Sequence, residues 1–171
     1  MSGASRTAAQ LRQAFDRSFA EPLHGATEPQ EDFLAIRLGG DAHAIRLVDI
    51  ANLLPLIALT RFPSPVPELL GITGFRGVIV PVYDLGALLG YAAQEPPRWL
   101  VFAAAGPVAL AFEAFEGHLR LARSARAPQH GADSSPRHVQ EVLRTSDQIR
   151  PVVSVASILE TIKTMVQQSA V

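Results

Sequence analysis

The chain has 171 residues, 48% of them hydrophobic, so it can bury the core of one ordinary domain or of two small subdomains. With 15 Lys and Arg against 16 Asp and Glu, its net charge of −1 provides no field that would attract nucleic acid or an anionic membrane. The lack of cysteine excludes disulfides, thiolate metal sites and cysteine nucleophiles. No apolar run reaches the roughly 18 residues of a membrane span, and the N-terminus lacks the apolar core of a signal peptide. We therefore expect a cytoplasmic protein without direct membrane insertion.

Residues 1–30 are predicted to form a helical and flexible extension. Within residues 7–20, three large apolar side chains recur four positions apart and would share one face of a helix: Leu11, Phe15 and Phe19. Such a helix would either pack loosely on the body of the protein or dock a partner. Residues 21–31 contain Pro22, Gly25 and Pro29, which indicates a linker.

Strand patterns begin at Asp32. FLAIRL (33–38) and AHAIRLVDI (42–50) flank a glycine turn and predict a hairpin. FPSPVP (62–67) has proline at every second position, which favours an ordered crossing loop over an exposed recognition motif. VIVPVY (78–83) predicts a further strand, in which Pro81 indicates an edge or a bulge.

The second half of the chain continues this pattern. Asp84 is predicted to cap a short helix in LGALL (85–89) that Gly90 ends. Hairpins are expected over residues 99–112 and 139–155, and residues 123–137, which hold no large apolar side chain, are expected to form a mobile loop. Ser157 and Glu160 have the spacing of a capping box for a C-terminal amphipathic helix. Repeated short strands with few helices point to antiparallel sheets closed into barrels.

The sequence predicts no catalytic residue, no metal site and no cofactor. It contains no nucleophile elbow, phosphate-binding loop or zinc-protease motif. Its histidines are scattered, without the spacing that brings two imidazoles to one metal: His24, His43, His118, His130 and His138. Glu113 and Glu116 would act as a general acid and base or simply face solvent, and the latter is favoured. A basic patch at Arg120, Arg123 and Arg126 lacks aromatic partners and is a weak signal for nucleic acid.

One arginine interrupts the otherwise aliphatic segment GITGFRGVIVPVYDLGALLG (71–90). Gly74 and Gly77 flank Phe75-Arg76 and let the backbone turn sharply, so that another surface can approach. Physical reasoning leaves two interpretations of Arg76 equally open. It would either recognise a partner at an exposed corner or bridge two subdomains through a carboxylate or carbonyl groups.

The same segment resembles the central signature of CheW-like domains, whose usual form is close to G-[VI]-x-N-L-R-G-x-[VI]-[VIL]-P-[VI]-x-D-L followed by a short helix. FLAIRLGGDAHAIRLVDIANLL is similar to the first hairpin of the family. AAAGPVALAFEAFEG resembles a later strand segment of the family, and IRPVVSVASILETI its closing strand and helix. The resemblance covers residues 31–166 in the expected order, and we assign residues 31–171 to a CheW-like domain.

The resemblance implies a mainly β fold of two small five-stranded SH3-like barrels that share a hydrophobic core, with a C-terminal amphipathic helix. It implies a non-enzymatic adaptor, recruited to cytoplasmic chemosensory arrays, that couples the tips of methyl-accepting chemoreceptors to a CheA-type histidine kinase. The kinase's regulatory domain, itself CheW-like, would bind barrel to barrel, as would other CheW-like proteins. The receptor hairpin would bind at a groove between the barrels. The residues implied for receptor binding are Arg76, Phe75, Gly74, Gly77, Ile50 and Asn52.

Several positions depart from the family pattern. Gly74 and Phe75 replace the usual Asn and Leu, and Asn52 replaces a glutamate that commonly pairs with the signature arginine. Glu113 and Ser154 stand where aspartates are usual. These departures suggest a divergent member.

Three alternatives to the coupling adaptor follow. A divergent regulator would bind a receptor or another adaptor but not the kinase. A small enzyme would use Arg76 with Glu113 and Glu116. A nucleic-acid-binding small barrel would show a steep salt dependence of binding.

Overall fold

The computed structural model describes residues 28–92, 95–128, 137–146 and 148–169. The predicted helix over residues 7–20 and residues 21–27 of the predicted linker lie outside the described residues. The same is true of His24, of His130 and of most of the loop expected over residues 123–137.

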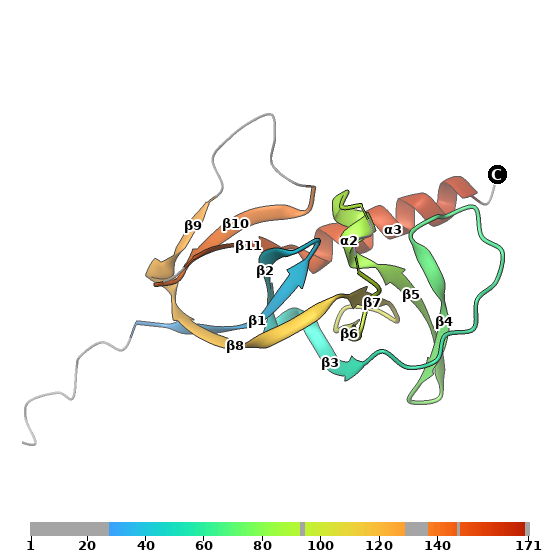
Figure 1. The fold of residues 1–171 in the computed structure, drawn as a ribbon, viewed down its shortest axis with the longest axis horizontal. Helices are drawn as coiled ribbons and strands as arrows, with labels where there is room; N and C mark the ends of the chain where they lie inside the picture. Colours follow the sequence, from blue (N-terminus) through green and yellow to red (C-terminus); the bar gives the residue numbers. More distant parts are fainter. Residues whose placement is uncertain (1–27, 93–94, 129–136, 147, 170–171) are drawn as a thin grey trace, which may run out of the picture.

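Eleven strands form two sheets in the described part of the chain (Figure 1). The first sheet has the order β8-β1-β2-β11-β10-β9, with the bounds β1 Gln30–Leu38, β2 Asp41–Arg46, β8 Ala114–Ala122, β9 Arg126–Pro128, β10 Val139–Arg144 and β11 Ile149–Val153. The second sheet has the order β3-β6-β7-β5-β4, with the bounds β3 Ile50–Pro55, β4 Leu69–Phe75, β5 Val78–Asp84, β6 Trp99–Ala103 and β7 Ala109–Phe112. The helical elements are η1 Leu47–Asp49, α2 Leu85–Leu89, η2 Arg123–Ala125 and α3 Val155–Ser169.

The two sheets share one hydrophobic core, as predicted. Its largest cluster takes Ile36 and Ile45 from the first sheet, Leu110 and Phe112 from the second, and Ile158 from α3, all of them at most 1% exposed. Smaller clusters lie within each sheet, around Phe33 in the first and Val82 in the second. The mainly β fold class with a C-terminal amphipathic helix is therefore confirmed, and the first sheet carries a sixth, three-residue strand, β9.

The predicted hairpins and the short helix are present. β1 and β2 pair antiparallel from Phe33↔Arg46 to Leu38↔Asp41, and β6 pairs with β7 in the same way. Asp84 caps α2 by accepting a hydrogen bond from the Ala87 amide at 3.0 Å. Gly90 ends the helix at a φ of 90°, in the left-handed region that favours glycine. These features depend on neighbours in sequence, which is why residue type and spacing suffice to predict them.

Two expectations about the C-terminal part are wrong. Residues 123–128 form η2 and β9 instead of the start of a mobile loop, because the side chain of Arg126 bonds to two glutamates and holds the strand without apolar burial. The helix α3 begins at Val155, so that Ser154 caps it, accepting from the Ser157 amide at 3.3 Å. Ser157 and Glu160 therefore do not form the expected capping box.

The chain just before the proline-rich crossing loop closes the outer edge of β4. Thr60 donates its amide to the Ile72 carbonyl at 2.9 Å and accepts from the Ile72 amide at 3.0 Å. Gly71 lies under this contact with a φ of 150°, and a Cβ placed there would lie 2.6 Å from the Thr60 carbonyl oxygen. On the other side of the hairpin, Pro81 precedes the point where β5 begins to pair with β7 at Val82. Its missing amide hydrogen therefore falls outside that pairing.

Candidate functional site: a hairpin tip and an interdomain groove

The signature arginine occupies the tip of the β4–β5 hairpin. Phe75 and Val78 are paired, so Arg76 and Gly77 form a two-residue turn. Their φ angles are 51° and 78°, and positive φ at both central residues is the requirement of a type I′ turn. Gly77 adopts this conformation easily, whereas Arg76 does so against the preference of a residue with a Cβ atom. The exposed arginine is thus held in an unfavourable backbone conformation at a solvent-facing corner.

The side chain of Arg76 lies over an aromatic pair. Its guanidinium carbon is 5.0 Å from the centre of the Phe75 ring, and that ring stacks on Phe102 of β6 at 4.0 Å. In the described part of the chain, Arg76 makes no ion pair with a carboxylate. Within the described residues, Arg76 therefore does not bridge two subdomains through an ion pair, and its role in recognition stays a prediction.

Asn52 and Ile50 lie on β3, at the opposite edge of the second sheet. Asn52 is the Cα partner of Phe102, and its side-chain oxygen accepts from the amide of Leu53 at 2.8 Å. Ile50 pairs with Ala103 and packs partly buried against the shared core. Asn52 and Phe75 thus meet the same residue, Phe102, from opposite edges of the sheet. The sequence patterns did not single out Phe102, because nothing local marks the residue on which two distant strands converge.

A groove lies between the two sheets, where η1 carries the chain from one to the other. We call it the Val48 groove; its lining is Val48, Asp49, Ala104, Ala105, Val155, Ala156 and Leu159, and its volume is about 260 Å³. The amide of Ala104 donates to the Asp49 carbonyl at 2.9 Å, which ties the β6–β7 turn to η1. Val155 and Leu159 form a nearly buried floor, while the rim residue Val48 is 80% exposed.

A second hollow shares Val48 with the groove. It is lined by Glu31, Asp32, Arg46, Leu47 and Val48, has a volume of about 530 Å³, and lies beside the start of β1. Leu47 is 40% exposed on its wall. The two openings together place an exposed aliphatic ridge, Leu47-Val48, at the junction of the sheets, and sequence reasoning had identified only the neighbouring Ile50.

The hairpin tip and the Val48 groove are neighbours through β6. Phe75 stacks on Phe102, and Ala104, two positions further along the chain, lines the groove. Two residues span at most roughly 7 Å of backbone. The predicted receptor-binding residues therefore do not form one contact cluster, and the buried Phe102 of β6 links the hairpin tip to the strand end that lines the groove.

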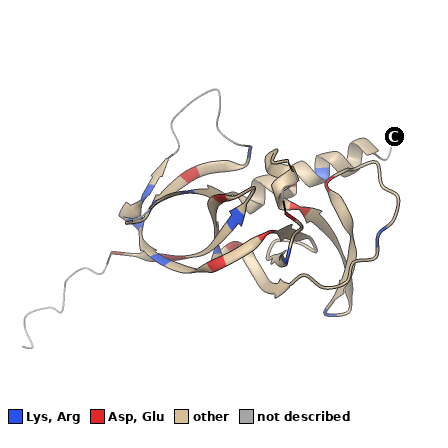
Figure 2. Cartoon of the chain, in the orientation of Figure 1, with Lys and Arg blue, Asp and Glu red and all other residues tan. Residues whose placement is uncertain are grey.

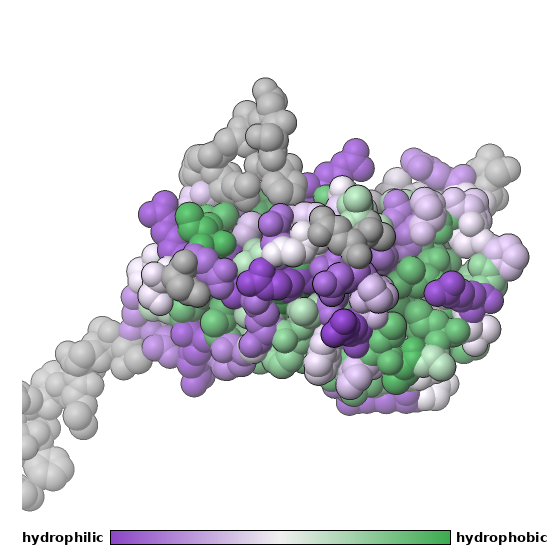
Figure 3. Space-filling view, in the orientation of Figure 1, coloured by the Kyte–Doolittle hydropathy of each residue, from purple (hydrophilic) through white to green (hydrophobic). Residues whose placement is uncertain are grey.

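The second sheet has an uncharged, partly exposed surface. Its five strands contain one charged residue, Asp84, and Figure 2 shows most acidic and basic residues on the first sheet. Val78 and Ile79, directly after the hairpin tip, are 53% and 70% exposed. In Figure 3 hydrophobic residues gather over the end of the molecule that the second sheet forms. Such a surface suits contact with another protein.

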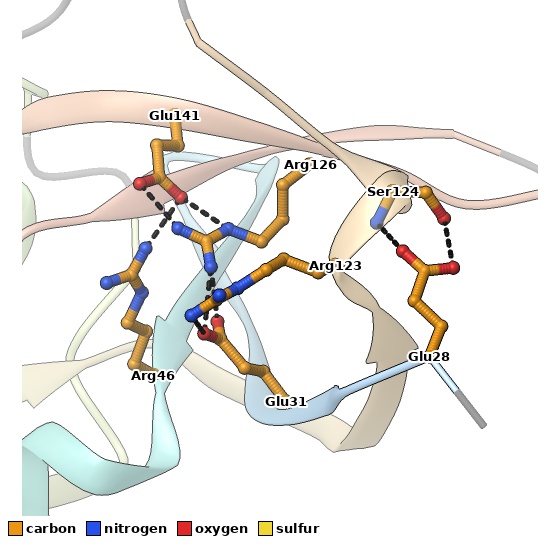
Figure 4. A network of polar contacts seen from close by, with 7 residues as sticks. All are labelled: Glu28, Glu31, Arg46, Arg123, Ser124, Arg126 and Glu141. Atoms are coloured by element: carbon orange, nitrogen blue, oxygen red, sulfur yellow. Dashed lines mark hydrogen bonds and ion pairs between the residues drawn. The ribbon is translucent and has the colours of Figure 1, made fainter. Parts of the chain in front are cut away.

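The arginines of the predicted basic patch are paired with acidic residues, and Figure 4 shows the pairs of Arg123 and Arg126. Arg126 donates to both carboxylate oxygens of Glu141, at 2.8 and 2.9 Å, and to Glu31 at 2.8 Å. The hydrogen bonds from Arg126, followed by those from Arg46, hold the pKa of Glu141 below its usual value despite burial. The same contact with Glu141 raises the pKa of Arg126. This network ties β9 and β10 to β1 and does not favour nucleic-acid binding.

The two glutamates considered as an acid–base pair are also engaged. Burial raises the pKa of Glu116, but hydrogen bonds from Arg150 and Arg37 outweigh it and bring the pKa below its usual value. Glu116 is the extra residue of a bulge, since Gly117 and Phe115 pair with consecutive residues of β1. Glu113 accepts from the Gly39 amide at 3.0 Å. Glu116 is therefore a poor proton donor at neutral pH, and this arrangement does not favour the enzyme alternative.

The described histidines serve the fold. His43 is buried beside Tyr91, and desolvation lowers its pKa. His118 lies 2.8 Å from Asp32, and His138 is hydrogen-bonded to Ser157. Among the described residues, no three acidic or histidine side chains lie together as a metal site would require. No helix in this part of the chain has the length and hydrophobicity needed to cross a membrane.

Comparisons with known proteins agree with this architecture. The family model of the CheW-like domain matches residues 32–163. The crystal structure of the scaffolding protein TtCheW from Thermoanaerobacter tengcongensis is similar, with a TM-score of 0.69 and 16% sequence identity over 77% of this chain and 94% of that chain. A comparison with curated proteins gave no match. The chain belongs to the CheW-like domain family.

Proposed function

We propose that this protein is a non-enzymatic chemosensory adaptor, which couples the cytoplasmic tips of methyl-accepting chemoreceptors to a CheA-type histidine kinase. Membership of the CheW-like family supports an adaptor role. The observation that carries the proposal is the exposed aliphatic ridge Leu47-Val48 at an open groove between the two sheets. An amphipathic helical hairpin can bury its apolar face in such a groove.

The receptor hairpin is proposed to bind the Val48 groove and the adjoining hairpin tip. Burial of Val48 supplies apolar contact, and the positively charged Arg76 supplies polar contacts that set the register. The side chain of Asn52 accepts from the Leu53 amide and carries no charge, so in our proposal it does not restrain Arg76. Phe75 stays on Phe102 as the fixed base of the tip.

The kinase's regulatory domain is proposed to bind the exposed pair Val78-Ile79. These side chains face solvent on a nearly uncharged sheet, whose contact with a second barrel would release water from apolar surface. Val78 and Ile79 belong to β5, whereas Val48 belongs to η1, so substitutions at the two surfaces can separate the two partners.

The first prediction tests both surfaces by titration calorimetry with a receptor-tip fragment and, separately, with the kinase's regulatory domain. Val48→Asp is expected to weaken receptor binding by about 30-fold or more, because it buries a carboxylate in an apolar contact. Ile79→Asp is expected to weaken kinase binding by a similar factor and to weaken receptor binding much less than Val48→Asp does. Matched controls are Val166→Asp on α3 and Ile149→Asp on β11, whose side chains are 49% and 62% exposed.

Each result decides between defined functions. Loss of one partner from each variant, with both controls unaffected, supports the coupling adaptor. Receptor binding without kinase binding in the unsubstituted protein would instead identify the divergent regulator that connects without engaging the kinase. Binding to neither partner would contradict the adaptor function.

The second prediction concerns the strained turn. Arg76→Asn is expected to raise the free energy of unfolding by about 1 kcal/mol, because Asn adopts positive φ more readily and Asn-Gly is a favoured type I′ pair. The same variant is expected to bind the receptor fragment more weakly than the unsubstituted protein. Urea unfolding and receptor titration on one preparation check both effects. Lower stability of the variant would mean that Arg76 stabilises the fold through Phe75, contrary to this prediction.

A further inference from the structure

The Leu47-Val48 ridge lies where the N-terminal part of the chain enters the fold. Phe33 of β1 is the Cα partner of Arg46 at the end of β2. Residues just before Phe33 therefore lie beside those just after Arg46, and Glu31, Asp32, Leu47 and Val48 line one hollow. Any segment that precedes β1 thus starts next to the exposed ridge.

The chain is anchored just before it enters β1. The carboxylate of Glu28 accepts from the amide of Ser124 at 2.5 Å and from its hydroxyl at 2.8 Å, and Pro29 accepts from the Arg123 amide at 3.1 Å (Figure 4 shows the Glu28 contacts). Glu31 lies three positions after Glu28, a backbone span of at most roughly 10 Å. The described chain therefore begins at an anchored residue, Glu28, close to the hollow.

The surface that the hollow offers is apolar, although two carboxylates line it. Glu31 accepts from Arg126 at 2.8 Å, and Asp32 lies 2.8 Å from His118 and 3.3 Å from Arg120. Because these charges already have partners, the exposed side chains of Leu47 and Val48 are what the hollow offers a ligand. A suitable ligand presents large apolar side chains on one face.

The residues that precede Glu28 contain such a ligand. Leu11, Phe15 and Phe19 recur four positions apart in the sequence and would lie on one face of a helix. Residues 20–27 would join this stripe to the anchor, and eight residues reach up to roughly 28 Å. A tether of this length gives an effective concentration on the order of millimolar, so a weak contact suffices for occupancy.

We infer that residues 7–20 bind the Leu47-Val48 ridge and the Val48 groove of the same chain, as an internal ligand. The competition that this creates with a receptor hairpin rests on the function proposed above. Partner binding then requires displacement of the N-terminal segment, so that changes in this segment set the availability of the groove.

Disulfide trapping in the full-length chain tests the docking directly, since the protein has no native cysteine. Ser18 lies three positions after Phe15, beside the apolar stripe, and Ala156 is exposed on the lining of the groove. The pair Ser18→Cys with Ala156→Cys is expected to form an intramolecular disulfide about tenfold faster than Ser18→Cys with Thr164→Cys. Thr164 is exposed on the same helix, about 12 Å further along.

Substitution of the stripe by Leu11→Ser, Phe15→Ser and Phe19→Ser is expected to abolish this difference in rate. Equal rates in the two cysteine pairs, or a preference that survives the serine substitutions, would overturn the inference. Crosslinked dimers in place of the intramolecular product would also overturn it, because a second copy would then supply the segment.

Receptor titration separates this inference from the proposed function. The triple serine variant is expected to bind the receptor fragment about tenfold more tightly than the unsubstituted chain, because the internal ligand no longer competes for the groove. Equal affinities would overturn the competition. Preferential trapping without any receptor binding would support self-docking and contradict the adaptor, whereas equal receptor binding without preferential trapping would support the adaptor and contradict self-docking.

Discussion

Gly71→Ala is expected to lower the free energy of unfolding by about 2–4 kcal/mol, since it adds backbone strain to a backbone clash. Gly71 has a φ of 150°, and a Cβ there would meet the Thr60 carbonyl oxygen at 2.6 Å. Relief of the clash requires the crossing loop to move away from β4, which breaks the two hydrogen bonds between Thr60 and Ile72. Urea unfolding followed by circular dichroism measures the loss.

Two other glycines of the chain separate the two causes. Gly117 has the same φ of 150° but no atom within 4 Å of its would-be Cβ, so Gly117→Ala introduces strain without a clash. Gly74 has an ordinary φ and open space, so Gly74→Ala introduces neither. The expected order of destabilisation is Gly71, then Gly117, then Gly74. A Gly71→Ala variant no less stable than Gly117→Ala would show that contact with the crossing loop does not constrain β4.

Arg126→Gln is expected to cost about 2–4 kcal/mol of stability, because one guanidinium makes charge-assisted hydrogen bonds to two glutamates that lie far apart in the sequence. Its loss leaves Glu31 with Arg123 at 3.7 Å and Glu141 with Arg46. The side chains are partly exposed, which keeps the effect below that of a fully buried network. The control Arg120→Gln removes an ion pair whose arginine is 64% exposed, and we expect less than about 0.5 kcal/mol from it.

The pH dependence of unfolding provides a second measure of the Arg126 network. The lowered pKa of Glu141 means that its contribution to stability is fully present above its usual value of 4.5 and is lost as pH falls through the lower pKa of the folded state. Arg126→Gln is therefore expected to flatten the acid limb of the stability curve. An acid limb as steep as that of the unsubstituted protein would show that Glu141 owes its low pKa to Arg46 instead.

The local architecture of this protein could be predicted from its sequence. Strand-length apolar runs around glycine turns predicted the β1–β2 and β6–β7 hairpins, and Asp84 and Gly90 predicted both ends of α2. Each of these signals acts over a few residues, where side-chain period, a capping carboxylate or a glycine at positive φ determines the conformation. The signature around Arg76 was sufficient to suggest the family.

Tertiary structure decided the features that join distant parts of the chain. Arg126 lies 95 positions from Glu31 in the sequence. Their contact holds β9 in place as a strand, where composition predicted a mobile loop. Phe102 became part of the candidate site because two strands from opposite edges of the sheet meet on it. Val48 is the most exposed apolar residue of the candidate site because η1 turns between the sheets at that point. The spacing of residues along the chain determines side-chain periodicity and turns. Contacts between side chains that are remote in sequence depend instead on how the two sheets pack around their shared core.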